Sequence, residues 1–207
     1  MTLQNRVRPD GEIITCPSRG TMMGNRGGAF HTAEQTLLPR HWHSRQWICC
    51  VLDFKGRHRQ VMQPRRYTEL FFLDEATALA AGHRPCFECR RAAALHFAHL
   101  WNDVRNLPGR ATAPDMDIIL HTERANRHGD KRTYSANIDT LPDHAFIRLG
   151  ADHFRVAGHH LQDWSFDGYG ALRPRPPDTK VEVLTPPTTV AVLGAGYVPV
   201  LHKSAAT

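Results

Sequence analysis

The sequence has no long apolar run, and this absence limits where we expect the protein to act. A membrane-spanning helix needs about 18 or more consecutive apolar residues, and no segment approaches that length. The first residues, Met1 to Arg6, also lack the apolar stretch of a secretory signal. We therefore expect a cytoplasmic protein without a membrane partner.

Familiar catalytic and nucleotide-binding motifs are missing as well. The chain contains no Walker phosphate loop, no HExxH zinc motif, no nucleophile elbow and no kinase signature. The glycine-rich segment from Gly11 to Gly28 lacks the GxGxxG spacing and shows neither a helical nor an alternating period. We expect this segment to be a loop.

Lysine is scarce, and positive charge is concentrated in the first half. Only four of the 26 basic residues are lysine; residues 1–110 hold 16 Lys and Arg against 9 Asp and Glu, and residues 111–207 hold 10 against 11. Guanidinium groups bind phosphate oxygens and aromatic rings stack on bases, so this composition suits a nucleic-acid surface, with DNA as the expected partner. Codon bias in a GC-rich genome is the alternative explanation. The expected nucleic-acid-binding residues are Arg45, Lys55, Arg57, Arg59, Arg65, Arg66, Arg84, Arg90 and Arg91, and Trp42, Trp47 and Phe54 lie among the first of them.

Cysteines are few and odd in number, which disfavours a disulfide framework. Cys86 and Cys89 form a CxxC pair between two helix-like segments, a spacing typical of zinc ligands. The alternative is that both pack as small apolar side chains. Cys16 has no interpretable partner. Because zinc takes four ligands, two more must come from elsewhere.

The adjacent Cys49 and Cys50 are the first candidates for the missing zinc ligands. They lie on a predicted strand, 47–54, which a Lys55-Gly56 turn would join to 57–62 as a hairpin. Alternation places Cys49 on the polar face, with Asp53, and Cys50 on the apolar face, with Ile48. One or both thiols would bind the metal. The histidines that could complete or replace this set are His43, His58, His96 and His99.

The segment from Glu69 to Arg90 carries a family resemblance. It runs through an aromatic strand, an alanine-rich helix and the ending Ala80-Ala81-Gly82-His83-Arg84-Pro85-Cys86-Phe87-Glu88-Cys89-Arg90. This resembles the second half of the N-terminal zinc domain of the Ada DNA-repair family. The resemblance implies a four-cysteine zinc site on a DNA-contacting module, with Cys86 and Cys89 as the later two ligands.

The earlier part of the family pattern does not match. The family has two cysteines separated by three residues, whereas this chain has the adjacent pair Cys49 and Cys50, farther from the CxxC. In Ada, one early cysteine also accepts a methyl group from a DNA phosphotriester. That activity does not carry over to this chain.

A second candidate site lies in residues 115–123. Read as a strand, this segment places alternate residues on one face, with carboxylates and an imidazole that could bind a divalent metal or transfer protons. An edge strand with a solvated polar face is the alternative. The candidate catalytic residues are Asp115, Asp117, His121 and Glu123.

The remaining pattern predicts an α+β protein. We expect a short strand at 70–73, helices at 75–81 and 90–103, a strand pair at 145–156, a strand at 180–184 and a helix at 186–193. Residues 1–110 would form a small, basic, zinc-stabilised module with a hairpin and helices. Residues 111–207 would form a β-rich half, possibly packed with the first half as one domain.

Three classes of function fit these features. The first is a zinc-stabilised DNA-binding protein that recognises damaged or modified DNA. The second is a DNA-acting hydrolase, either a base-excising glycosylase or a nuclease, with its chemistry in residues 115–123. The third is a zinc-stabilised protein-interaction module, in which the arginine content reflects codon bias.

Overall fold

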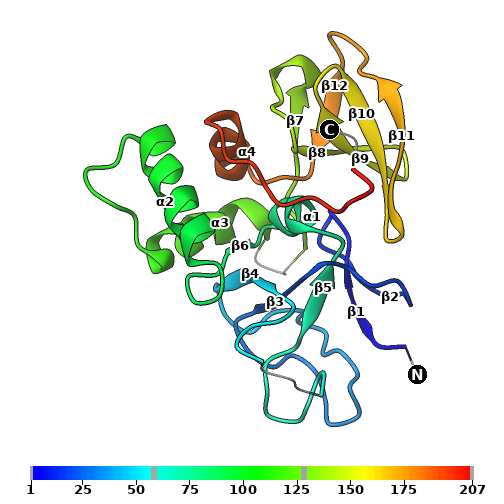
Figure 1. Ribbon diagram of the computed structural model, residues 1–207, viewed down its shortest axis with the longest axis vertical. Helices are drawn as coiled ribbons and strands as arrows, with labels where there is room; N and C mark the ends of the chain where they lie inside the picture. The colour runs from blue at the N-terminus through cyan, green and yellow to red at the C-terminus, as the bar shows by residue number, and fades with distance from the viewer. Residues whose placement is uncertain (1, 57–59, 127–129, 206–207) are drawn as a thin grey trace.

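The computed structural model describes residues 2–56, 60–126 and 130–205. Two six-stranded sheets and four α-helices make up this mixed α and β fold. Figure 1 shows the two sheets stacked along the long axis, with α1 between them and α2 and α3 to one side. None of the described helices is long and apolar enough to cross a membrane.

The first sheet comes from the first half of the chain and has the order β2-β1-β5-β3-β4-β6. The central β3 pairs antiparallel with both β4 and β5, and β4 pairs parallel with β6. The strands are β1 (Gln4–Val7), β2 (Ile13–Thr15), β3 (Met22–Arg26), β4 (Trp47–Val51), β5 (Leu70–Phe72) and β6 (Arg84–Pro85).

The second sheet comes from the second half and has the order β11-β10-β9-β8-β12-β7, with every pairing antiparallel. A 3₁₀ turn, η1 (Ile138–Thr140), follows β7. The strands are β7 (Tyr134–Asn137), β8 (Phe146–Leu149), β9 (Asp152–Ala157), β10 (His160–Ser165), β11 (Gly168–Pro174) and β12 (Lys180–Val183).

Helix α1 (Glu75–Ala80) joins the parts of the fold. It is buried on all sides, as an alanine-rich helix can be, because its small side chains let neighbours approach closely. Ala78 packs in the core of the first sheet, Ala76 contacts the second sheet, and Leu79 packs with the other helices.

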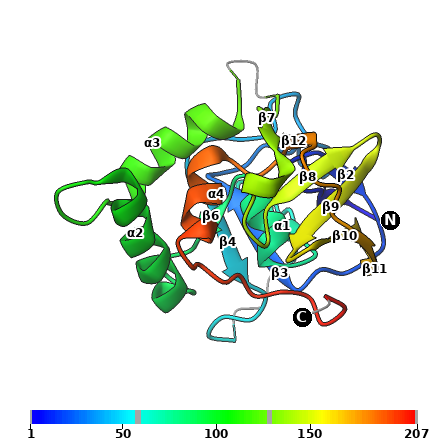
Figure 2. The same ribbon diagram turned by 90° about the horizontal axis from the view of Figure 1, so that it is seen from above.

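The other helices form one layer, seen beside the sheets in Figure 2. They are α2 (Arg91–Arg105), α3 (Ala113–Arg124) and α4 (Pro187–Gly194). Phe97 of α2, Met116 of α3 and Val192 of α4 share one buried cluster. The helix layer therefore combines residues from both sides of position 110.

Most of the predicted elements are present. The strands at 70–73 and 180–184, the strand pair at 145–156 and the helices at 75–81, 90–103 and 186–193 are found with small shifts at their ends. Asp74 caps α1 through its side chain, and Gly82 follows the helix with φ +87°, a conformation that favours glycine.

Three predictions of local structure are wrong. The expected loop at 11–28 contains β3, where Gly24 is needed because a Cβ there would lie 2.2 Å from the carbonyl oxygen of Ile48. The partners of β4 are β3 and β6, so the hairpin of 47–54 with 57–62 does not form in the described residues. Residues 115–123 are helical, in α3, because Thr112 and Asp115 form a capping box that starts a helix.

Asp74 is buried and accepts four hydrogen bonds, so we expect its replacement to destabilise the fold strongly. Its oxygens accept from the Thr77 backbone and hydroxyl, the Tyr169 hydroxyl and the His202 backbone at 2.8–3.0 Å. Asp74→Ala should lower the free energy of unfolding by about 3 kcal/mol or more, because it leaves buried donors unpaired.

Asp115→Ala is the matched control, since Asp115 also serves a helix start but is exposed. It should cost about 1 kcal/mol or less. Urea denaturation followed by circular dichroism would measure both. Equal losses in the two variants would contradict the proposed importance of Asp74.

Candidate metal centre

Strand pairing brings three cysteines together. Because β4 and β6 run parallel, Cys49 lies opposite Pro85, and the Cys86 backbone N–H donates to the Cys49 carbonyl at 2.9 Å. The chain then turns tightly, with the Arg90 N–H donating to the Cys86 carbonyl at 3.0 Å. This turn places Cys86 and Cys89 next to Cys50.

The sulfur atoms of Cys50, Cys86 and Cys89 all lie within 4.8 Å of one another. Tetrahedral zinc with Zn–S bonds of about 2.3 Å requires sulfur atoms about 3.8 Å apart. The cluster is thus close to the spacing that one metal ion needs. Among the described residues, no further His, Cys, Asp or Glu joins these three.

The thiols also form hydrogen bonds that prepare them for a metal. The neighbouring Cys50 thiol lowers the pKa of Cys86 to about 5 and lowers the pKa of Cys89, while these two sulfurs raise the pKa of Cys50. The Glu88 N–H, 3.4 Å from the Cys86 sulfur, adds to the effect on Cys86. A metal ion would take the place of the Cys50 proton.

Cys49 does not belong to the cluster. It is fully buried on the opposite face of β4, where it packs with Leu70 and Phe72 and lies 3.8 Å from Arg90 Nη1. Burial raises its pKa. The sequence separated the two thiols correctly but assigned their faces in reverse, because Cys49 faces the core and Cys50 faces outward.

The candidate histidines do not join the cluster either. His43 packs against Gly28, His96 lies against Tyr197 with ring centroids 5.6 Å apart, and the exposed His99 is 3.5 Å from Asp103. His58 lies outside the described residues.

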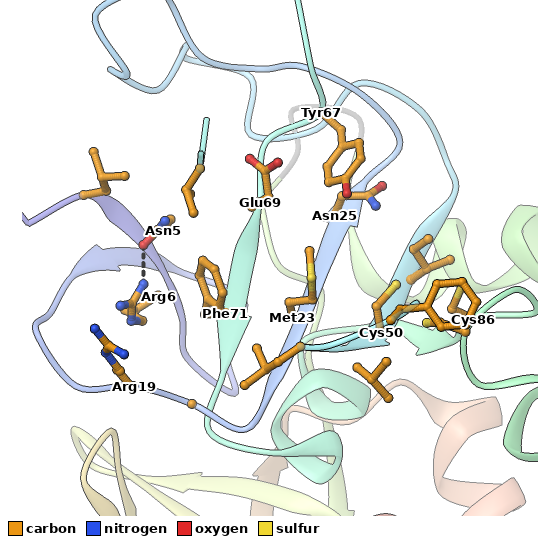
Figure 3. Close-up of a pocket in the computed structure, with 18 of the residues that line it drawn as sticks. Asn5, Arg6, Arg19, Met23, Asn25, Cys50, Tyr67, Glu69, Phe71 and Cys86 are labelled. Carbon is orange, nitrogen blue, oxygen red and sulfur yellow. Dashed lines mark hydrogen bonds between the residues drawn. The ribbon is translucent and has the colours of Figure 1, made fainter. Parts of the chain in front are cut away.

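The cysteine cluster forms one end of a pocket of about 930 Å³ on the outer face of the first sheet (Figure 3). One row of paired residues crosses this face: Arg6 is paired with Phe71, Phe71 with Met23, and Met23 with Cys50. The pocket therefore has an apolar floor between the sulfurs and Arg6.

The far end of the pocket is basic. Arg6 donates to the Ser18 carbonyl at 2.6 Å and lies over the Phe71 ring, 4.9 Å from its centroid. Arg19 is exposed and lines the same end. Figure 3 shows both side chains on the opposite side of the sheet face from Cys50.

Glu69 is a pocket residue that sequence reasoning missed. Its side chain is only 4% exposed, and its Oε2 accepts from the Met62 N–H at 2.6 Å. Its Oε1 has no hydrogen-bond partner among the described residues. A buried carboxylate oxygen without a hydrogen-bond partner is uncommon in proteins, which makes Glu69 a candidate functional residue.

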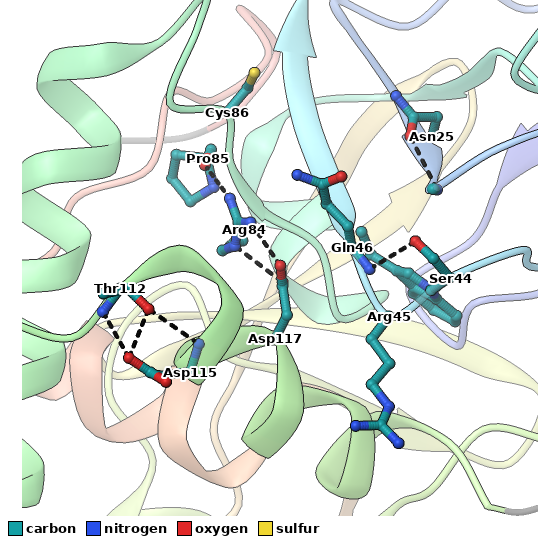
Figure 4. A network of polar contacts seen from close by, with 12 residues as sticks. Asn25, Ser44, Arg45, Gln46, Arg84, Pro85, Cys86, Thr112, Asp115 and Asp117 are labelled. Carbon is teal, nitrogen blue, oxygen red and sulfur yellow. Dashed lines mark hydrogen bonds and ion pairs between the residues drawn. The ribbon is translucent and has the colours of Figure 1, made fainter.

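The predicted catalytic residues of 115–123 do not share one face. Asp115 caps α3, and Asp117 accepts a bidentate ion pair from Arg84 at 2.7 and 2.9 Å (Figure 4). His121 packs on Trp42, and burial with nearby arginines lowers its pKa to about 4. Glu123 accepts from Thr188 of α4. These contacts give each side chain a structural role, and their catalytic role stays a prediction.

The predicted nucleic-acid-binding arginines divide into two groups. Arg84 is buried with Asp117, and Arg90 is buried with Glu75, so neither lies on the surface as expected. Arg57 and Arg59 lie outside the described residues. The exposed members of the set are Arg45, Lys55, Arg65, Arg66 and Arg91.

The pKa differences predict a selective alkylation of the metal-free protein. Because the pKa of Cys86 is about 5, its thiolate forms above that pH, and iodoacetamide should modify Cys86 well below pH 7 while leaving the buried Cys49 unmodified. Cys50→Ala removes the hydrogen-bond donor and should move the midpoint of Cys86 alkylation to higher pH. Mass spectrometry of digested protein over a pH series would measure this.

Cys49→Ala is the matched control and should leave the Cys86 midpoint in place, because Cys49 lies on the other face of β4. An equal shift in the two variants would contradict the geometry of the cluster.

Comparisons of the chain with protein-family models, with curated proteins and with solved structures found no match.

Proposed function

We propose that Cys50, Cys86 and Cys89 bind zinc. Three thiolates favour zinc over hard cations such as magnesium, which prefer oxygen ligands. The spacing of the sulfurs supports the same assignment. Bound zinc would supply a Lewis acid at this end of the pocket, within a centre that the three thiolates leave with a net negative charge.

A zinc ion held by these three sulfurs would lie at the wall of the pocket. The three sulfurs come from β4 and from the turn after β6, and all three residues line the pocket. Structural zinc sites are closed by four protein ligands, whereas functional sites keep one position for water or substrate. The three described ligands fit the second type, and a role for His58 stays a prediction.

We further propose that the pocket and its rim bind nucleic acid. The single observation that carries this proposal is that one pocket has the cysteine cluster at one end and Arg6 and Arg19 at the other. Guanidinium groups hold phosphates, and Arg6 lies over the Phe71 ring on the pocket floor. A pocket of about 930 Å³ matches the size of small-ligand sites and has room for a nucleotide unit.

The exposed cations near the pocket extend this basic surface. Lys55 follows the pocket residue Phe54, and Arg65 and Arg66 precede the pocket residue Tyr67. A nucleic-acid backbone could follow these side chains while one unit enters the pocket. Selection of a damaged or modified unit would then depend on the groups around the metal.

Glu69 supports a second candidate, a hydrolase acting on the same ligand. Glu69 lines the pocket that holds the cysteine cluster, and its buried Oε1 has no hydrogen-bond partner among the described residues. In such an enzyme Glu69 would accept a proton from the attacking water. This proposal places the chemistry at a residue that lines the pocket, and a catalytic role for residues 115–123 stays a separate prediction.

The zinc proposal predicts that metal content follows the cluster. Wild-type protein should bind about one zinc ion per chain, because one cluster is present. Cys50→Ala, Cys86→Ala and Cys89→Ala should each lose most of it, whereas Cys49→Ala should retain it. Plasma emission spectroscopy on purified proteins would measure the ratio. Full zinc content in Cys86→Ala or Cys89→Ala would refute the proposed site.

The nucleic-acid proposal predicts a salt-dependent affinity. Log affinity for a fluorescent DNA strand should fall linearly with log salt, and Arg19→Ala or Arg66→Ala should reduce that slope by about one, because each removes a phosphate contact. Lys180→Ala, an exposed change on the second sheet, should leave the slope unchanged. Fluorescence anisotropy over a salt series measures both effects.

The same mixtures separate a binding protein from a hydrolase. DNA with normal and modified bases would be scored for nicks and abasic sites. If the wild type forms these products and Glu69→Gln does not, while the variant keeps its zinc content and its affinity for DNA, the protein is a hydrolase. Binding without products would support the binding protein, and a flat salt series with no products would refute both.

A further inference from the structure

A second cavity, of about 340 Å³, lies at the junction of the two sheets. It is bordered by the end of β3 at Arg26, the start of β4 at Trp47, and the last residue of α3, Arg124. Lys131 and the β1–β2 turn at Gly11 close it from the other side. This cavity is separate from the cysteine pocket.

Arg26 brings the first positive charge to this cavity. Its side chain is 97% buried, since the residue is only 3% exposed. It donates to the carbonyl oxygens of Gly11 at 2.9 Å and His41 at 3.3 Å and lies over the Trp47 ring at 4.1 Å. All of these partners are neutral.

Arg124 brings the second positive charge to the cavity. It is 1% exposed, donates to the carbonyl oxygens of Gly82 and Arg45, and lies 4.2 Å from the centroid of the same Trp47 ring. Its Nε has no hydrogen-bond partner among the described residues. A buried guanidinium thus keeps one donor unused beside the cavity.

Lys131 brings the third positive charge to the cavity. Its Nζ donates to the Ala80 carbonyl at 2.6 Å, which leaves two of its three N–H donors without an acceptor among the described residues. A side chain at Gly11 would meet both the Lys131 Cδ, at 3.7 Å, and the Arg26 Nη2, at 3.8 Å. Lys131 and Arg26 therefore reach the same part of the cavity.

The carboxylates around the cavity are engaged elsewhere. Asp10 and Glu12 pair with Arg8, and Asp10 also pairs with His153. Glu182 pairs with Arg148, and Asp130 accepts from Asn126. No described carboxylate forms a salt bridge with Arg26, Arg124 or Lys131.

This arrangement is electrostatically incomplete. Burial lowers the pKa of Arg26 to about 9, and burial with the charges of Arg26 and Arg124 lowers the pKa of Lys131 to about 7. Buried charges are normally paired, because desolvation without a counter-charge costs several kcal/mol. Asp10 acts on Lys131 and Asp117 acts on Arg124 only from a distance, so an anion bound in the cavity would supply the direct counter-charge.

We propose that this cavity binds a small oxyanion of the phosphate type, with Arg26, Arg124 and Lys131 as its cationic partners. Three donors that approach from β3, α3 and the loop before β7 suit a tetrahedral anion better than a flat carboxylate. The burial of both guanidinium groups excludes the backbone of a nucleic-acid duplex. A cavity of about 340 Å³ holds free phosphate or a small phosphate ester.

The test is thermal unfolding of the full chain as purified, with inorganic phosphate against chloride at equal ionic strength. A ligand that binds only the folded state raises Tm with its concentration. Wild-type protein should show this increase, sulfate should act similarly, and titration calorimetry should give the affinity. Lys131→Met should weaken phosphate binding at least tenfold, whereas Lys180→Met, an exposed lysine on β12, should not.

Each result decides the proposal. Loss of the phosphate response in Lys131→Met, with the response of Lys180→Met retained, supports it. Absence of phosphate and sulfate binding in the wild type, or an undiminished affinity in Lys131→Met, overturns it. If Lys131→Met does not fold, Arg26→Met and Lys131→Gln provide the same comparison. The affinities for phosphate and for glycerol phosphate show whether the cavity prefers the free ion or an ester. Phosphate binding at this cavity does not depend on zinc or DNA.

Discussion

Two adjacent buried carboxylates, Asp74 and Glu75, hold the parts of this fold together. Asp74 accepts from Tyr169 of the second sheet and from the backbone of His202. Glu75 accepts two bonds from Arg90 at 2.5 Å and one from the Tyr197 hydroxyl at 2.6 Å. Asp74 and Glu75, at the start of α1, therefore hold α2, the second sheet and the C-terminal segment in place. Both side chains are buried, and a buried charge must be paired.

The candidate metal centre depends on the same interaction. Arg90 follows Cys89 directly, so its ion pair with Glu75 anchors the end of the cysteine turn to α1. The other end of the turn is held by the Cys86 N–H on the Cys49 carbonyl. The backbone thus positions the three sulfurs in advance, which would reduce the conformational entropy that metal binding has to remove.

Much of the fold could be predicted from the sequence, but the packing of the site could not. Helix α1 was predictable because Asp74 and Gly82 mark its ends, and the CxxC pair was predictable from its spacing. The face of β4 that carries Cys50 was not predictable. Alternation puts the two thiols on opposite faces, but strands distant in the sequence decide which face is buried. The strand predicted at 115–123 failed because alternating polar residues also fit a helix, and the cap at Thr112 was the deciding signal. Glu69 carried no local signal at all.

Because Cys49 and Cys50 are adjacent, metal binding alone would not fix the register of β4. If β4 slipped by one residue, Cys49 would move into the cluster and a three-thiol site would still be present. The slipped strand would differ at Trp47, which would leave its buried place between Arg26, Arg124 and His83 and face outward. Trp47, rather than the thiols themselves, therefore determines which of the two adjacent cysteines joins the cluster.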